Sequence, residues 1–242
     1  MNNFKRNNTI LGIFTFLIAF VVYALTAEPT ASFWDCGEFI AASYKLQVVH
    51  PPGAPFFLLL GNLFSNFAFG DVSKVAFMVN LLSAFTSALC VMFTCWTITH
   101  FAEKLFKTIN TEETGRQVLI LGAGLIGALA LTFSDTFWFS AVEAEVYASS
   151  SFFTAFTFWC ILKWEHNSEK SGADKWLVFI AYLIGVAIGV HLLNLLVIPA
   201  IVYVYYFKNR EFTTKGFLVS SLIGIAILGF VQVGIIPGLP GL

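Results

Sequence analysis

Charged side chains are scarce in this sequence of 242 residues. Asp, Glu, Lys and Arg make up 11% of the chain, and the formal net charge is −1. Proteins that bind nucleic acid through its phosphates carry an excess of Lys and Arg, often in patches interleaved with aromatic residues. The sequence has neither feature, so nucleic acid is excluded as a partner.

Cysteine is also scarce, with four residues in the chain: Cys36, Cys90, Cys95 and Cys160. None of them has the short C-x-x-C spacing of a structural metal site. Three lie within apolar stretches, where cysteine acts as a small packing residue. The sequence therefore predicts neither a cysteine-ligated metal nor a disulfide within the chain.

Hydrophobic residues are abundant instead: they form 58% of the sequence, and the mean hydropathy is +0.81. A helix needs about 20 apolar residues to cross a bilayer. Stretches of about that length lie at 9–26, 75–101, 118–138, 146–164 and 217–235, and a run at 176–207 is long enough for two short spans. The expected fold class is an all-α polytopic membrane protein.

The first apolar stretch follows Lys5 and Arg6, as in a secretory signal peptide. It is long for a signal peptide, and no small-x-small cleavage site follows it. We therefore expect it to be retained as the first span.

The basic residues indicate how the spans are oriented, because short loops rich in Lys and Arg stay in the cytoplasm. Eleven of the 13 basic residues form four clusters: Lys5 and Arg6; Lys104, Lys107 and Arg116; Lys163, Lys170 and Lys175; Lys208, Arg210 and Lys215. All four are cytoplasmic if the short, interrupted stretch 56–69 does not cross and 176–207 turns near 191–194. This arrangement has about seven spans, a cytoplasmic N-terminus and an external C-terminus.

The same arrangement gives the outer face several acidic residues and only two of the 13 basic residues, Lys45 and Lys74. The first outer loop, 27–74, holds Glu28, Asp35, Glu38, His50 and Asp71. A second outer segment holds Glu143 and Glu145, with Asp135 expected just inside the preceding span. The positive-inside rule does not require an acidic outer face, so these residues are candidates for function.

Among these acids, Asp35 and Glu38 are the pair with the clearest indication of a function. A spacing of three places both on one face of a helix, and we expect a membrane-surface helix over 33–48 that ends before "HPPG". A second surface helix is expected to start at or just after Pro52. The pair could supply a general base, bind a divalent cation that holds a phosphate, or be solvated loop charge.

The other outer-face residues leave two interpretations open. Glu143 and Glu145 are either substrate contacts or interfacial charge beside the aromatic residues Trp138 and Tyr147. His191 and Asn194 interrupt an apolar run, and such residues either belong to a site or hydrogen-bond between helices.

The stretch "TASFWDCGEFIAASYKLQVVHPPGAPFF" resembles the GT-C glycosyltransferases, especially the protein O-mannosyltransferases. Those enzymes carry an acidic pair in the first outer loop and a His-Pro-Pro motif after it. The stretch is most similar to a multispanning family catalogued as domain of unknown function 2723. One departure is that Cys36 and Gly37 separate the two acids, whereas the O-mannosyltransferase acids are adjacent.

The resemblance implies an enzyme that transfers a sugar, such as mannose, from a polyprenyl-phosphate carrier to an acceptor protein at the periplasmic or lumenal side of a membrane. We expect a bacterial inner membrane. It implies catalytic roles for Asp35 and Glu38, without deciding which is the base. The same resemblance makes His50, Glu143 and Glu145 substrate-binding candidates, with His50 shaping the site. His191, Asn194 and Lys45 complete the candidate set.

The carrier phosphate requires a cation, which Lys45, Lys74, a divalent metal at Asp35 and Glu38, or residues beyond Leu242 could supply. No cofactor is otherwise implied. We expect residues 1–242 to form one transmembrane module, the N-terminal part of a longer protein. Two other classes of function stay open: a transporter or flippase of a lipid-linked sugar, and a non-catalytic membrane assembly subunit.

The topology generates a first prediction. Single cysteines introduced between residues 104 and 116 should react with membrane-impermeant thiol reagents only after the cytoplasmic side is opened. Cysteines introduced between 67 and 73 should react in intact cells or vesicles with the outer side exposed. External labelling at 104–116 would show that 56–69 crosses the membrane.

Overall fold

The computed structural model describes residues 3–106 and 113–238, and every regular element in this part of the chain is helical. Lys107 and the final residues 239–242 lie outside the described residues. The chain divides into two compact units. Unit 1 comprises Met1–Phe156 with Gly189–His191, and unit 2 comprises Thr157–Ile188 with Leu192–Leu242.

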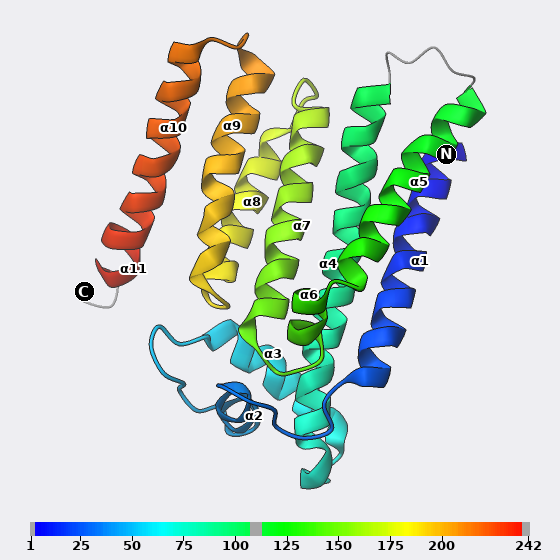
Figure 1. Cartoon of the computed structure of the whole chain (residues 1–242). Coiled ribbons are helices and arrows are strands. Elements are labelled where there is room, and N and C mark those ends of the chain that lie inside the picture. The colour runs from blue at the N-terminus through cyan, green and yellow to red at the C-terminus, as the bar shows by residue number, and fades with distance from the viewer. Residues whose placement is uncertain (1–2, 107–112, 239–242) are drawn as a thin grey trace. The chain divides into compact units, whose positions relative to one another are not determined.

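Three long helices form the centre of unit 1: α1 (Asn3–Thr26), α4 (Val75–Phe106) and α5 (Glu113–Thr132). They lie side by side (Figure 1), and α4 packs against both of the others. Their contact surfaces are rich in small buried residues, including Ala19, Ala84, Ala88 and Ala128. Small side chains let helix backbones approach closely, which is the main source of helix association in lipid.

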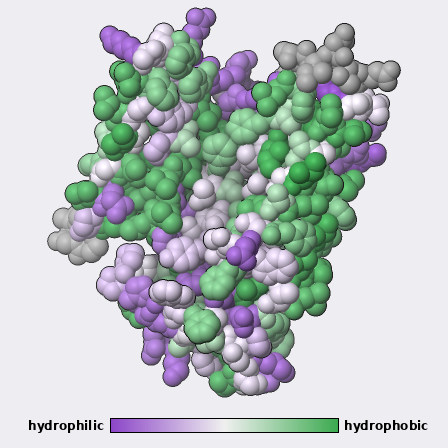
Figure 2. Space-filling model, in the orientation of Figure 1, coloured by the Kyte–Doolittle hydropathy of each residue, from purple (hydrophilic) through white to green (hydrophobic). Residues whose placement is uncertain are grey.

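Five helical segments are long and apolar enough to cross a membrane: Asn3–Thr26, Val72–Phe106, Glu113–Thr132, Leu192–Asn209 and Thr214–Ile235. Apolar side chains on α1 and α5 face outward, as Leu25 and Ile126 do with 82% and 71% of their surface exposed. Figure 2 shows this hydrophobic side of unit 1, with hydrophilic residues gathered instead around α2 and α3. An outward apolar surface of this kind identifies an integral membrane protein.

Among the described residues, five of the roughly seven predicted spans have sufficient length and hydropathy to cross a membrane. The two other expected spans are α7 (Val146–Asn167) and α8 (Asp174–Ile188). Helix α7 contains three consecutive serines and ends in a polar turn, which lowers its hydropathy. Helix α8 has 15 residues, so it is about 22 Å long against a hydrocarbon core of about 30 Å.

Two sequence-based boundaries are confirmed. The run 176–207 breaks as expected: α8 ends at Ile188, a 3-10 turn (η3) covers Leu192–Leu196, and α9 covers Val197–Asn209. The stretch 56–69 forms α3 (Pro55–Ser65) and a 3-10 turn (Asn66–Ala68), followed by another 3-10 turn (Val72–Lys74). Eleven residues of α3 extend about 16 Å, too short to cross a bilayer.

One span prediction is wrong. The apolar stretch 118–138 is not one helix, because α5 ends at Thr132 and a short helix, α6 (Asp135–Ala141), begins after Ser134. Asp135 therefore lies in the first turn of α6 and not inside the span. Serine at an N-cap followed by an acidic residue is a common helix start, which the hydropathy of the stretch conceals.

Unit 2 contains α8, α9 and α10 (Thr214–Gly229), followed by a π-helical turn (Phe230–Ile235) and α11 (Ile236–Gly238). The Trp164 and Tyr205 rings stack at 5.7 Å. Helices α9 and α10 border a groove of about 1070 Å³, lined by apolar residues and by Arg210 and Glu211 at its polar end. None of its described lining residues belongs to the candidate site from the sequence.

A buried amide fixes the segment that leads from α1 to the candidate site. Asn80 on α4 is fully buried, and its Nδ2 donates hydrogen bonds to the carbonyl oxygens of Glu28 at 2.6 Å and Thr30 at 3.0 Å. The amide of Glu28 donates to the carbonyl of Val142 at 2.9 Å. The segment that follows α1 is thereby tied both to α4 and to the connection between α6 and α7.

Replacing this amide should loosen unit 1. Asn80→Ala leaves two carbonyls without their donor, and we expect a loss of about 1–3 kcal/mol in the free energy of unfolding. Thermal unfolding of the purified protein in detergent measures the change. The matched control is Asn66→Ala, since the Asn66 side chain is exposed and donates a hydrogen bond to the Asn62 carbonyl one helical turn away. Equal stability of the two variants would contradict the role of Asn80.

Candidate active site

Helix α2 (Cys36–Lys45) positions the two acids singled out in the sequence. It is shorter than the expected 33–48, because Trp34 and Leu46 adopt left-handed conformations with φ of 58° and 50°. Such residues end a helix, and Leu46 closes α2 with amide hydrogen bonds to carbonyls of its last turn. Asp35 is the N-cap residue and Glu38 lies in the first turn.

The "HPPG" segment makes a tight turn between α2 and α3. The amide of Gly53 donates to the carbonyl of His50 at 2.9 Å, and Gly53 has a φ of 75°. This conformation is not helical, so α3 begins at Pro55, three residues after Pro52. The amide of Phe56 donates to the carbonyl of Gly189 at 2.8 Å, which anchors the start of α3 within unit 1.

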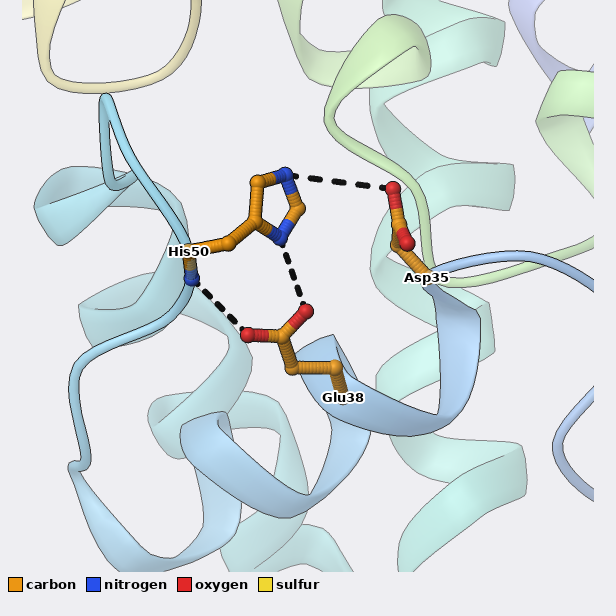
Figure 3. Close-up of side chains that lie close together, drawn as sticks. All are labelled: Asp35, Glu38 and His50. Atoms are coloured by element: carbon orange, nitrogen blue, oxygen red, sulfur yellow. Dashed lines mark hydrogen bonds and ion pairs between the residues drawn. The ribbon is translucent and has the colours of Figure 1, made fainter.

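Asp35, Glu38 and His50 form a compact cluster (Figure 3). The His50 amide donates to Glu38 Oε1 at 2.8 Å, and His50 Nδ1 pairs with Glu38 Oε2 at 2.8 Å. The opposite ring nitrogen, Nε2, lies 3.9 Å from Asp35 Oδ2. The imidazole therefore lies between the two carboxylates, hydrogen-bonded to one and directed toward the other.

The hydrogen bonds set the charges of this cluster. The hydrogen bond that Glu38 accepts from the imidazole raises the pKa of His50 above its usual range, and the negative charges of Glu38, Asp35 and Glu145 act in the same direction. The hydrogen bonds from the His50 ring and amide lower the pKa of Glu38. Both shifts favour an imidazolium paired with a carboxylate.

Two further acids approach from the connection between α6 and α7. Glu143 and Glu145 are only 3% and 6% exposed. The hydroxyl of Ser32 donates to Glu143 Oε2, and burial raises the pKa of Glu143. Burial, followed by the charges of Glu143 and Asp35, raises the pKa of Glu145 to about 7, while the backbone amides of Val146 and Asp35 oppose the shift. Glu145 thus lies beside Asp35 and within electrostatic reach of His50.

The remaining candidates from the sequence are placed differently. His191 packs its ring against Tyr147 at 5.3 Å, and burial lowers its pKa. Asn194 is buried in unit 2, where its Nδ2 donates to the Ala187 carbonyl at 3.2 Å. Lys45 occupies the last turn of α2, about 15 Å along the axis from Asp35. The structure therefore groups Asp35, Glu38, His50 and Glu145, and it separates Lys45 from them.

A divalent cation is another use for this cluster. One donor atom from each of Asp35, Glu38 and His50 lies within 4.8 Å of the others, and all three residues are exposed. Carboxylate oxygen and imidazole nitrogen are suitable ligands. The hydrogen bonds between Glu38 and His50 already satisfy both donor groups, however, so the observed geometry is that of an ion pair.

Sequence reasoning missed two residues that hold the site together, Ser32 and Asn80. Asn80 could have been identified from the sequence, because a polar side chain within an apolar span is costly unless it has a structural or functional partner. Ser32 could not, because serine is common in loops and only the fold brings it to Glu143, 111 residues away.

The buried acid Glu145 generates a prediction about pH. Its pKa in the folded protein, about 7, exceeds the ordinary 4.5, so its contribution to stability is fully present below about pH 4.5 and is lost as the pH rises through 7. Glu145→Gln should remove this loss and raise the unfolding temperature above pH 7. The control is Asp71→Asn, an exposed acid in the same unit. An unchanged pH profile in Glu145→Gln would contradict the assignment.

Comparison with known proteins identifies the family. Residues 35–214 match the family described as "Protein O-mannosyl-transferase TMEM260 N-terminal domain". The chain is 25% identical over 235 residues to the "Protein O-mannosyl-transferase tmem260" of Dictyostelium discoideum, covering 93% of this chain and 27% of the relative. It is 26% identical over 213 residues to the mouse "Protein O-mannosyl-transferase TMEM260", and the match covers 86% of this chain and 28% of the relative.

The chain thus spans little more than a quarter of the length of these curated relatives. No solved structure shows a significant match. The family match covers most of the chain, and it includes Asp35, Glu38, His50 and Glu145. This chain belongs to the family of the protein O-mannosyl-transferase TMEM260 N-terminal domain.

Proposed function

We propose that this chain carries the catalytic site of a membrane glycosyltransferase that moves mannose from a polyprenyl-phosphate carrier to an acceptor protein. The observation that carries the proposal is a half-exposed Asp35 carboxylate beside an oriented histidine, in a chain of an O-mannosyl-transferase family. Membership of the family supports the sugar and the acceptor. The carrier is proposed because the site lies on a membrane protein, where a lipid-linked donor is held close to the enzyme.

Asp35 suits the role of general base. A phosphate is a good leaving group, so the demanding proton transfer is the removal of the acceptor proton. Both oxygens of Glu38 are engaged by His50. The Asp35 carboxylate accepts no hydrogen bond from a described residue, and its nearest described cation, His50 Nε2, lies 3.9 Å away. Asp35 is therefore the acid that is free to approach an acceptor hydroxyl.

We place the site on the periplasmic or lumenal face, with the N-terminus in the cytoplasm and α2 and α3 on the membrane surface. The distribution of basic residues in the sequence supports this topology, as does the short length of α3. In this arrangement α7 and α8 complete seven spans, as in the N-terminal module of a GT-C enzyme. Neither helix is among the five segments that cross by length and hydropathy, so seven spans are part of the proposal.

A transporter or flippase fits the charge distribution less well. A pathway across the bilayer needs polar or charged groups at several depths. The charged residues of α1, Lys5 and Arg6, lie near its start, and those of α4, Glu103 and Lys104, lie near its end. The long interiors of both helices contain no Asp, Glu, Lys or Arg. An assembly subunit would not need an oriented histidine between two acids.

Asp35→Asn should lower the rate of mannose transfer about 10²- to 10⁴-fold, because the amide cannot accept the acceptor proton. The assay follows radiolabel from polyprenyl-phosphate mannose into the protein fraction of membranes that contain the protein. Unfolding temperature checks that the variant is folded.

The matched control is Asp71→Asn, which removes an exposed acid of the same outer loop that pairs with Lys74 at 3.0 Å. Transfer by this control should match that of the unmodified protein. Full transfer by Asp35→Asn would remove Asp35 from the role of base. Labelled donor appearing across vesicle membranes without transfer to protein would favour the flippase.

A further inference from the structure

We propose that His50, held in place by Glu38, binds the phosphate of the lipid-linked donor. Glu38 is then a positioning residue for His50 and not an alternative base. This inference rests on the proposed function and deepens it by assigning the group that meets the carrier phosphate.

Hydrogen bonding and ring packing hold His50 in one orientation. The Glu38 carboxylate accepts a hydrogen bond from the backbone amide of His50 and pairs with its ring Nδ1. The first contact fixes the backbone at His50, and the second orients the ring. The Phe39 ring packs edge-on against the imidazole at 6.0 Å. With Nδ1 occupied, Nε2 is the nitrogen left to meet a ligand, and it points into the space beside Asp35 (Figure 3).

The surroundings of His50 are rich in negative charge. A phosphate that enters beside Asp35, Glu38 and Glu145 meets negative charge on each side and needs a compensating cation. Lys74 pairs with Asp71 at 3.0 Å, and Lys45 lies at the far end of α2. Among the described residues of the cluster, His50 is the group that can carry a positive charge.

The surroundings of His50 favour that charge. Glu38 on α2, Asp35 at its N-cap and Glu145 from the connection between α6 and α7 all raise the pKa of His50, while partial burial opposes them. In His191 the opposite holds, because burial alone lowers the pKa. Of these two histidines in unit 1, His50 is the one suited to bind an anion as an imidazolium.

The transfer step then divides between two residues. The acceptor oxygen bonds to the anomeric carbon of the mannose, and its proton moves to the Asp35 carboxylate. The bond between the anomeric carbon and the phosphate oxygen breaks, and its electron pair stays on that oxygen, so the carrier leaves as polyprenyl phosphate. His50 Nε2–H donates a hydrogen bond to the phosphate as this charge grows. The Asp35 side chain, half-exposed and without a hydrogen bond from a described residue, is free to turn from Nε2 toward the acceptor.

His50→Gln tests the phosphate contact. A charge-assisted hydrogen bond is lost, so we expect the KM for polyprenyl-phosphate mannose and its Kd in a direct binding assay to rise about 10- to 100-fold. The binding assay uses the radiolabelled donor with purified protein and needs no acceptor. Lys74→Ala is the matched control, because it removes an exposed cation of the same loop from a different ion pair.

Glu38→Gln tests the positioning role through the pH dependence of activity, which a simple loss of folded protein would not shift. Activity should fall at high pH as His50 loses its proton, and removing the Glu38 charge should move this alkaline limb to lower pH. An alkaline limb that is unchanged in Glu38→Gln would overturn the positioning role.

The outcomes separate this inference from the proposed function. Normal donor binding by a folded His50→Gln, with transfer intact in the unmodified protein, would overturn the inference alone. If donor binding depends on His50 but no mannose is transferred to any protein, the inference is supported and the proposed function is contradicted. Transfer that is abolished by chelation and restored by a divalent cation, with an unchanged alkaline limb in Glu38→Gln, would assign the phosphate to a metal and overturn the role of His50.

Discussion

Two hydrogen bonds that the Glu38 carboxylate accepts from His50 hold the candidate site together. They close the chain between α2 and α3, and they orient the imidazole so that Nε2 faces Asp35. The Phe39 ring of α2 adds an edge-on contact to the same imidazole. The rest of the site depends on the pair of Glu38 and His50, because it decides which acid is engaged, which acid is free, and which ring nitrogen can meet a ligand.

The hydrocarbon environment explains why such a cluster lies at the ends of the helices. Charged groups are costly within a bilayer, and unit 1 presents apolar side chains around α1 and α5. The polar segments that connect the helices are instead folded against each other by buried polar groups. Asn80 holds the segment after α1, and Ser32 meets Glu143. These contacts bring Glu145 to Asp35 although 110 positions separate them in the sequence.

Hydropathy and charge were sufficient to predict the helical class, the break before η3 and the short α3, because length and polarity decide whether a segment can cross a membrane. They failed where a single backbone conformation decides the outcome. Leu46 ends α2 in a left-handed conformation without the glycine that usually signals one, and Gly53 delays α3 to Pro55. The pairing of Glu38 with His50 could not be predicted either, since the helical spacing of Asp35 and Glu38 suggested that the two acids act together.

The central claim is that the donor phosphate lies against His50 with the sugar toward Asp35. The most direct measurement is an experimental structure of the full-length protein in lipid with polyprenyl-phosphate mannose bound. We expect a phosphate oxygen within hydrogen-bond distance of His50 Nε2, Glu38 still paired with Nδ1, and the Asp35 carboxylate facing the anomeric carbon. A phosphate held elsewhere, or held by a metal ion bound to Asp35 and Glu38, would contradict this arrangement.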